Sequence, residues 1–284
     1  EFAYEHAIRT MQQALCCKIE ENMLELSQFD EESRHMAQKR LQLWQQIQGR
    51  GKILRISACL IAKNEAKDLP RWLQNAFVYC DEAILVDTGS TDATVRIAEA
   101  SGASVYTYDW QDDFASAKNF ALEQAQGDWI ALLDADEYFA EPEKVRGFLA
   151  WLDCTQPETD AAMVMLSNID EDDHNQEIQR FTAVRLFRNS PALRYRGRVH
   201  EAVYRKQGEL QLWIESQRLL IYHTGYSSRR IQAKLERNMA LLQADIAQHG
   251  EQPGQYRYLA DCYFGMKDYE KTLHYALLAI DAKV

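Results

Sequence analysis

Hydrophobic positions in the first 50 residues recur every three or four places, which predicts two amphipathic helices. The series runs through Ile8, Met11, Leu15, Ile19 and Met23, and then through Met36, Leu43, Trp44 and Ile47. Asp30, a good residue for the start of a helix, lies in the gap between them. We expect residues 1–52 to form a packing or dimerisation element, so a homodimer is one candidate assembly, and we assign this segment no chemistry.

From residue 53 the pattern changes to short apolar runs that alternate with segments of helical length. This alternation is typical of βαβ units and a largely parallel sheet. The predicted strands cover residues 53–61, 83–86, 104–108, 129–133, 161–166 and 183–187. The predicted helices cover residues 68–79, 92–101 and 115–126, and Gly102 and Gly127 follow the last two, where a left-handed C-terminal cap is favoured. Residues 53–226 are therefore predicted to form an open α/β domain that binds its ligand beyond the carboxyl ends of the strands.

The pattern is helical again from residue 227 to residue 284. Apolar residues recur at Ile231, Leu235, Met239, Leu242 and Ile246. The segments 256–264 and 269–280 then resemble one tetratricopeptide helix pair. Because such pairs stack to share a core, we expect this region to continue into further repeats.

Charge and composition narrow the choice of function. The chain has 32 Lys and Arg against 43 Asp and Glu, a net charge of −11, which disfavours a nucleic-acid partner. Its apolar runs are too short to cross a bilayer and its N-terminus lacks a signal-peptide pattern, so we expect a cytoplasmic protein. The six cysteines lack the spacing of a zinc knuckle and are expected to be buried thiols.

The most informative segment is the apolar run 129–133 followed by Asp134, Ala135 and Asp136. Alternation along a strand would point both carboxylates the same way at the carboxyl edge of the sheet. Mg²⁺ or Mn²⁺ favours one or two carboxylates beside a diphosphate. The segment therefore indicates a divalent-metal site, and the alternative is an acidic loop after a buried strand.

Two further strands end in polar residues. The run 83–86 leads into Asp87, Gly89, Ser90 and Asp92, and the first strand leads into Asn64 and Glu65. A carboxylate at the tip of a strand can accept a hydrogen bond from the imide of a uracil or thymine ring. The alternative is that Ser90 or Thr91 is an ordinary helix N-cap.

These segments, in this order, resemble those of family-two glycosyltransferases of the GT-A fold. The resemblance rests on Asn64-Glu65, on the segment 87–92, and on Asp134-Ala135-Asp136. It extends to the segments 113–119, 185–188, 197–201 and 222–226 and covers most of the chain from residue 53 onward. Within the family, the layout is most similar to the sublancin-type peptide S-glycosyltransferases and related tetratricopeptide-bearing enzymes. It implies a Rossmann-like GT-A nucleotide-sugar-binding domain with N-terminal helices and a C-terminal tetratricopeptide-like segment.

The resemblance also implies roles for individual residues. Asp87 would bind the nucleobase, Asp134 the ribose or the sugar, and Asp136 a Mn²⁺ or Mg²⁺ ion that bridges the diphosphate, with His223 as a second ligand. Lys118 stands where relatives usually have Arg, so its contact with the nucleotide would not be bidentate. The remaining donor contacts would be Ala62, Asn64, Glu65, Ser90, Ala135 and Arg198.

For the chemistry, Glu201 is the predicted general base, with His200 behind it. The alternative is that Glu201 pairs with Arg196 or Arg198. These two belong to a cluster with Arg185, Arg188 and Arg194, which we expect to balance the acidic run 170–173 or other surface carboxylates. The alternative is that some of them contact phosphates of the donor or an anionic acceptor.

The predicted function is a metal-dependent, inverting glycosyltransferase of the hexosyltransferase class. It would move a sugar from a UDP-sugar, or from a dTDP- or GDP-sugar, to a peptide or protein side chain. One alternative is an acceptor saccharide such as a lipopolysaccharide core, and a second is a non-catalytic nucleotide-binding adaptor. A nucleotidyltransferase is disfavoured because no glycine-rich, Lys-containing loop follows the first strand.

Overall fold

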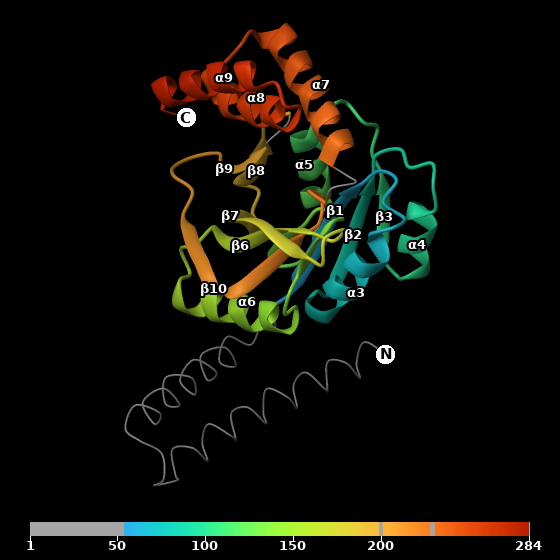
Figure 1. Ribbon diagram of the computed structural model, residues 1–284. Helices are drawn as coiled ribbons and strands as arrows, with labels where there is room; N and C mark the ends of the chain where they lie inside the picture. Colours follow the sequence, from blue (N-terminus) through green and yellow to red (C-terminus); the bar gives the residue numbers. More distant parts are fainter. Residues whose placement is uncertain (1–53, 199–200, 228–230, 284) are drawn as a thin grey trace, which may run out of the picture. The chain divides into compact units, whose positions relative to one another are not determined.

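The computed structural model describes residues 54–198, 201–227 and 231–283 (Figure 1). The chain separates into two units, and the one that comprises Arg55–Gly147 and Glu158–Val284 contains the sheet and the candidate site. The two helices predicted within residues 1–52 lie outside the described residues. None of the described helices has the length and apolar character that a membrane crossing requires.

The first part of the domain consists of βα units that match the predicted pattern. Its strands are β1 (Ile56–Ala62), β2 (Glu82–Asp87), β3 (Ser104–Thr107) and β4 (Trp129–Leu132), and its helices are α3 (Leu69–Tyr79), α4 (Thr94–Ala100) and α5 (Phe114–Gln124). β1 pairs in parallel with both β2 and β4, and β3 pairs with β2. The chain therefore reverses its direction across the sheet between β1 and β4, and crevices beside such switch points bind ligands.

The second part of the sheet is mixed rather than parallel. It contains β5 (Glu137–Phe139), β6 (Ala161–Asp170), β7 (Gln176–Arg188) and β10 (Leu212–His223), and the sheet order is β3-β2-β1-β4-β7-β6-β10-β5. β7 pairs antiparallel with both β4 and β6. β8 (Leu193–Arg196) and β9 (Ala202–Arg205) form a separate hairpin, and α6 (Glu143–Thr155) follows β5. The sequence did not predict β5, β8, β9 or β10, because these strands carry many polar residues and lack long apolar runs.

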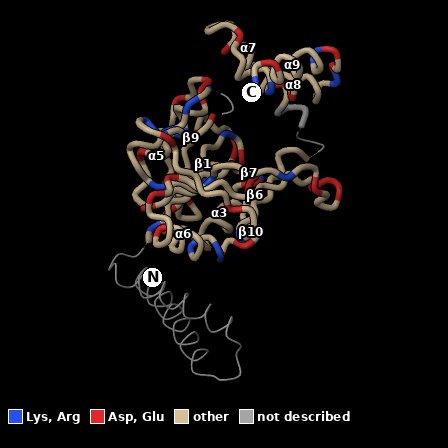
Figure 2. The backbone as a smooth tube through the Cα atoms, turned by 90° about the vertical axis from the view of Figure 1, so that its left-hand side faces the viewer, with Lys and Arg blue, Asp and Glu red and all other residues tan. Residues whose placement is uncertain are grey.

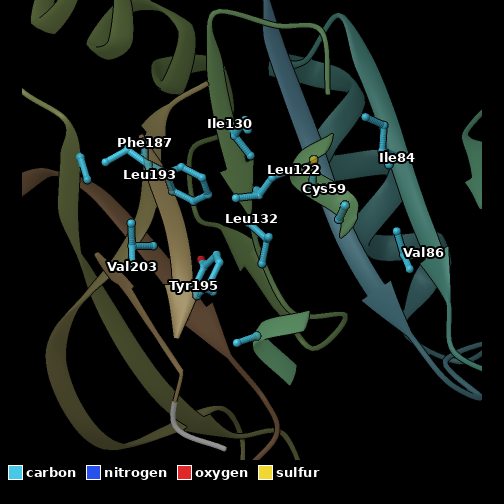
Figure 3. Packing of buried hydrophobic residues seen from close by; sticks show 13 residues of the cluster. Cys59, Ile84, Val86, Leu122, Ile130, Leu132, Phe187, Leu193, Tyr195 and Val203 are labelled. Atoms are coloured by element: carbon cyan, nitrogen blue, oxygen red, sulfur yellow. The ribbon is translucent and has the colours of Figure 1, made fainter. Parts of the chain in front are cut away.

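The core on one face of the sheet packs α5 against β1, β2 and β4 (Figure 3). Cys59, Ile84 and Ile130 of the strands form one buried cluster with Leu122 of α5, and Phe187 and Leu193 extend it. Cys59, Cys80 and Cys262 are buried as expected, whereas Cys154 is partly exposed and Cys16 and Cys17 lie outside the described residues.

The two glycines predicted as helix caps have different roles. Gly102 has φ +87°, the left-handed conformation expected after α4. Gly127 is not left-handed, since α5 ends earlier and its C-cap is Ala125 in an extended conformation. A Cβ atom at Gly127 would lie 2.6 Å from Ser57 Oγ, so a close approach to β1 requires glycine there.

Three helices follow the sheet, as predicted: α7 (Ile231–His249), α8 (Pro253–Gly265) and α9 (Tyr269–Ala282). Met239 and Leu242 of α7 pack with Leu259 and Cys262 of α8. α8 and α9 form a helix pair in which the rings of Tyr263 and Tyr275 stack with centroids 5.6 Å apart. The tetratricopeptide character of this pair stays a prediction, as do the predicted domain boundaries.

Candidate active site

A cavity of about 960 Å³ opens at the carboxyl ends of β1 and β4, where the switch point predicts a ligand. This volume is within the range of small-molecule and cofactor sites. Nine of the predicted site residues line it: Ala62, Asn64, Glu65, Lys118, Asp134, Ala135, Asp136, Glu201 and His223. The predicted residues Asp87, Ser90 and Arg198 are described but do not line it. His200 lies outside the described residues.

A turn, rather than a continuous strand, positions the two aspartates. β4 ends at Leu132, and the backbone N–H of Glu137 donates to the carbonyl oxygen of Asp134 at 3.0 Å. Strand alternation therefore does not set the direction of these side chains, although both aspartates line the same cavity. Asp134 faces Lys118, with Oδ1 3.4 Å from Nζ, and Asp136 faces His223 instead.

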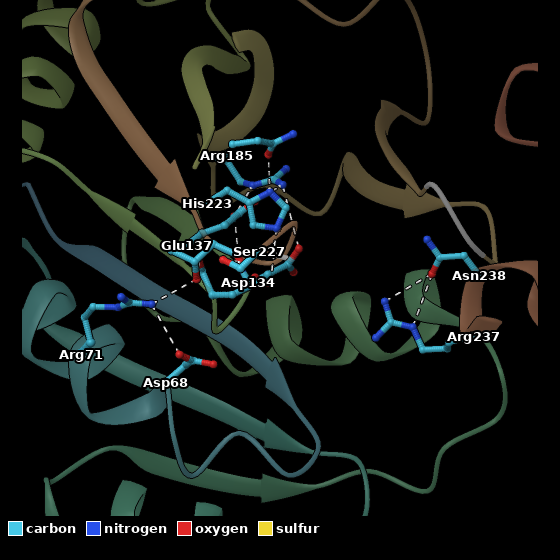
Figure 4. A network of polar contacts seen from close by, with 12 residues as sticks. Asp68, Arg71, Asp134, Glu137, Arg185, His223, Ser227, Arg237 and Asn238 are labelled. Carbon is cyan, nitrogen blue, oxygen red and sulfur yellow. Dashed lines mark hydrogen bonds and ion pairs between the residues drawn. The ribbon is translucent and has the colours of Figure 1, made fainter. Parts of the chain in front are cut away.

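A buried ion pair between Glu137 and Arg185 stabilises this turn. Glu137, whose side chain is 1% exposed, accepts from Nε and Nη2 of Arg185 at 2.6 Å each. Its carboxylate also accepts from the backbone N–H of Asp134 at 3.1 Å (Figure 4). Burial alone would lower the pKa of Arg185, but the charges of Glu137 and Asp134 raise it above its usual range. The guanidinium therefore stays charged, and the bidentate pair fixes the turn that carries both aspartates.

Asp136 and His223 form a pair that suits a divalent ion. His223 Nε2 lies 3.3 Å from Asp136 Oδ2, and Nδ1 lies 2.7 Å from Asn168 Oδ1. Because an amide oxygen can only accept, Nδ1 carries the hydrogen, and in the neutral ring Nε2 presents its lone pair to the carboxylate. A polar group behind the distal nitrogen is the usual support of a metal-bound histidine. A divalent ion held between them would take one electron pair from Nε2 and one from the carboxylate.

The donor set also suits the hard ions of nucleotide chemistry. Among the described residues, no group of three or more His, Cys, Asp or Glu side chains is arranged to hold a metal. A site with one carboxylate and one imidazole leaves coordination positions for phosphate oxygens and water, which Mg²⁺ usually retains. Asp136 and His223 therefore fit an ion that is bound together with a diphosphate.

Lys118 connects the carboxylates on the other side of the cavity. Its Nζ lies 2.5 Å from Glu201 Oε1 and 3.4 Å from Asp134 Oδ1, and its side chain is 5% exposed. Burial alone would lower the pKa of Lys118, but Asp134 and Glu201 raise it above its usual range. The alternative in which Glu201 pairs with Arg196 or Arg198 is not what the structure shows. Glu201 instead lies in the cavity beside a buried ammonium group.

The polar residues after β1 and β2 bind each other. Asn64, in a left-handed conformation with φ 59°, donates its backbone N–H to Ser90 Oγ at 2.9 Å. Its side-chain oxygen accepts from the backbone N–H of Thr91 at 2.7 Å. The carboxylate of Asp87 accepts from the backbone N–H groups of Gly89 and Ser90 at 3.1–3.2 Å. These contacts tie the two loops together on one side of the cavity.

Two other predicted site residues, Ala62 and Arg198, make hydrogen bonds through their backbone carbonyl groups. The carbonyl oxygen of Ala62 accepts from the N–H and hydroxyl of Thr88, which places Thr88 at the cavity wall. The carbonyl oxygen of Arg198 accepts from the N–H of Phe114 at 2.9 Å and so anchors the start of α5.

The described contacts of the arginine cluster differ from the expected pairing with the acidic run 170–173 or other surface carboxylates. Arg185 pairs with a buried carboxylate, Arg188 and Arg194 donate to backbone carbonyls, and Arg196 lies over the Tyr204 ring at 3.5 Å. The acidic run forms the turn between β6 and β7 (Figure 2), and its Glu171 pairs with Arg71.

Three supporting residues were missed: Glu137, Arg185 and Asn168. Glu137 directly follows Asp136, and an apolar strand leads into all three acidic residues, which was the available signal. Arg185 lies in the segment 185–188 of the family resemblance, but no local pattern assigns it to Glu137, and none marks Asn168, because their partners are 48 and 55 residues away.

Comparison with known proteins agrees with this geometry. The sequence profile of glycosyl transferase family 2 matches residues 57–212, so the chain belongs to that family. A TPR repeat-containing protein of Synechococcus elongatus is 33% identical over 204 residues, 69% of this chain and 49% of that protein. The prophage-derived glycosyltransferase SunS of Bacillus subtilis is 29% identical over 203 residues, 70% of this chain and 46% of that protein. The chain thus spans about half the length of these curated relatives.

Among solved structures, Staphylococcus aureus TarS 1–349 in complex with UDP-GlcNAc has 16% identity and a TM-score of 0.48. The match covers 81% of this chain and 79% of the TarS chain. The family match makes the described domain a glycosyltransferase domain of the GT-A type, as predicted. Its sheet is mixed, whereas the sequence predicted a largely parallel one.

Proposed function

We propose that this chain transfers a sugar from a UDP-sugar to a peptide or protein side chain with the help of Mn²⁺ or Mg²⁺. The observation that carries the proposal is that Asp136 and His223 face each other in the cavity that Glu201 also lines. An ion site can neutralise charge on a departing diphosphate, and a carboxylate in the same cavity can accept the proton of the attacking group.

The donor would lie along the ends of β1 and β4. A divalent ion held by Asp136 and His223 would neutralise negative charge on the departing diphosphate. Asp134 is the proposed contact to the ribose or sugar, and Lys118 adds a positive charge beside it. Asp87 is the proposed uracil contact, because a carboxylate that accepts two backbone N–H groups retains lone pairs for a third donor.

Transfer with inversion needs one base, placed beside the group that receives the sugar. The acceptor oxygen or sulfur forms the new bond to the sugar carbon while the bond from that carbon to the diphosphate oxygen breaks. The acceptor's proton passes to the Glu201 carboxylate, and the electron pair leaves with the nucleoside diphosphate. Lys118, 2.5 Å from Glu201, holds that carboxylate in the cavity.

A polypeptide acceptor is proposed because of the helices after the sheet. Arg237, Asn238 and Leu241 of α7 line the cavity together with the predicted site residues. Helix pairs of the predicted tetratricopeptide type form concave surfaces that bind peptides.

The test is nucleotide release with a panel of donors and acceptors. The protein is incubated with Mn²⁺, with UDP-, dTDP- or GDP-sugars, and with either a peptide containing Cys, Ser and Thr or an oligosaccharide. We expect release of UDP that depends on the peptide. Release only with the oligosaccharide would contradict the acceptor, release only from other nucleotides would contradict the donor, and no release in any combination would contradict the enzymatic proposal.

A further inference from the structure

A side-chain network beside the cavity is centred on Arg71 of α3 (Figure 4). Nη2 of Arg71 donates to Thr224 Oγ1 at 3.2 Å and to Asp68 Oδ1 at 3.4 Å, and Nη1 pairs with Glu171. The guanidinium carbon lies 4.5 Å from the centroid of the Tyr138 ring. One side chain therefore contacts β5 and the segments that follow β6 and β10.

Thr224 passes this contact to Asp136. Thr224 directly follows His223, is fully buried, and donates to the carbonyl oxygen of Asp136 through its backbone N–H at 3.0 Å and its hydroxyl at 3.3 Å. A hydroxyl has a single hydrogen, so a lone pair of the same oxygen accepts from Arg71. The backbone of Asp136 is thus tied to the residue beside His223, and that residue is tied to Arg71.

A second connection runs through the turn after β10. The backbone N–H of Glu171 donates to Ser227 Oγ at 3.1 Å, and Ser227 Oγ donates to the carbonyl oxygen of Thr224 at 2.7 Å. The turn that begins at Thr224 is therefore held on two sides, and both connections include a partner of Arg71.

The pairing of β5 with β10 brings the two proposed ligands close together, since Asp136 directly precedes β5 and His223 ends β10. Tyr222 and His223 of β10 pair with Tyr138 and Glu137 of β5. Tyr138, whose ring contacts Arg71, therefore lies two residues from Asp136 and opposite the residue that precedes His223. The rings of Tyr138 and Tyr222 lie with centroids 5.7 Å apart. A displacement at Tyr138 or Thr224 would consequently change the separation of Asp136 and His223.

We propose that Arg71 is a positioning residue for the divalent-ion site, which fixes the separation of Asp136 and His223 through Thr224. The inference rests on the proposed function. Arg71 does not line the cavity in the described part of the chain, so it acts through Thr224 and not on the donor. A planar guanidinium can serve three partners in fixed directions, which the single ammonium group of lysine does not reproduce.

The test measures the affinity for Mn²⁺ in the presence of UDP, from the free Mn²⁺ signal in electron paramagnetic resonance. Loss of a residue that supports metal ligands typically weakens metal affinity about 10–100-fold, and we expect that range for Arg71→Met. Arg71→Lys should recover only part of the loss. Equal Mn²⁺ affinity in wild type and Arg71→Met would overturn the inference.

Arg146→Met is the matched control. Arg146 also pairs with a carboxylate, Asp81 at 2.8 Å, and donates to the carbonyl oxygen of Tyr79, and neither of these partners belongs to the network. It should lower the melting temperature as Arg71→Met does and leave the Mn²⁺ affinity within about twofold of wild type, well below the range expected for metal support. An equal loss of Mn²⁺ affinity in Arg146→Met would mean that Arg71 contributes only general stability.

Thr224→Val and Thr224→Ser provide a second pair if Arg71→Met does not fold. Valine keeps the shape but removes the hydroxyl between Arg71 and Asp136, and serine keeps it. We expect weaker Mn²⁺ binding for valine and nearly wild-type binding for serine. If wild type itself binds no Mn²⁺ with UDP, the proposed function fails; if wild type binds and all of these variants bind equally, only the role of Arg71 fails.

Discussion

The two sides of the cavity use their polar residues differently. After β1 and β2, Asn64, Ser90 and Asp87 mostly bind one another and the backbone of their own loops. After β4 and β10, Asp136 and His223 face each other in the cavity. Separate residues hold them there: Glu137 accepts from the backbone N–H of Asp134 in the turn that carries Asp136, and Asn168 accepts from His223. A polar residue at the tip of a strand can therefore shape a loop or contact a ligand, and its hydrogen-bond partners distinguish the two roles.

The largest effect is expected at Glu201. Glu201→Gln removes the proposed proton acceptor but preserves the shape, and general-base catalysis contributes about 10²–10⁴-fold to the rate. Turnover should fall by that factor while the dissociation constant for UDP changes little, because Glu201 acts on the acceptor. Steady-state kinetics and calorimetry of UDP binding provide the two readouts.

Glu209→Gln, on the exposed turn after β9, is the control for that change and should leave turnover unaltered. Normal turnover in Glu201→Gln would exclude Glu201 as the base.

A large effect on stability is expected at Glu137. Glu137→Gln leaves the guanidinium of Arg185 without its bidentate partner, and removal of one member of a buried ion pair costs about 3–5 kcal/mol. The free energy of unfolding in urea should fall by about that amount.

The exposed pair Glu141–Lys144 provides the comparison, since its side chains are 53% and 51% exposed. Glu141→Gln should change stability by less than about 1 kcal/mol. If both variants lose the same small amount, Glu137 does not anchor the turn.

The smallest effect is expected at Ser90. Ser90→Ala removes the acceptor of the Asn64 N–H, and the loss of one such hydrogen bond should cost about 1 kcal/mol of stability. If Ser90 acts only through the loop, the KM for the donor should stay within about threefold, because a direct hydrogen bond would contribute more to binding.

Ser101→Ala, at the C-terminal end of α4, is the matched serine control and should change neither quantity. A tenfold or larger rise in the donor KM for Ser90→Ala would instead favour the predicted direct contact between Ser90 and the donor.

The βα half of the domain could be predicted because each of its strands is a short apolar run and each of its helices follows within the next few residues. The run 129–133 marks β4, and the polar residues after it mark the edge of the sheet at which the cavity opens. Antiparallel pairing of β7 with β4 depends on contacts between distant segments, and no periodicity specifies it. For the same reason the sequence identified Asp136 but not Asn168, and identified the acidic run but not its partner Arg71.

The most direct test of the central claim is calorimetry of UDP binding with and without Mn²⁺, in wild type and in Asp136→Asn. If Asp136 and His223 hold a divalent ion beside the diphosphate, Mn²⁺ should strengthen UDP binding to wild type at least about tenfold, a coupling of about 1.4 kcal/mol, and Asp136→Asn should lose this dependence. UDP binding that is independent of Mn²⁺ in wild type, or a dependence that survives in Asp136→Asn, would contradict a divalent-ion site at Asp136 and His223.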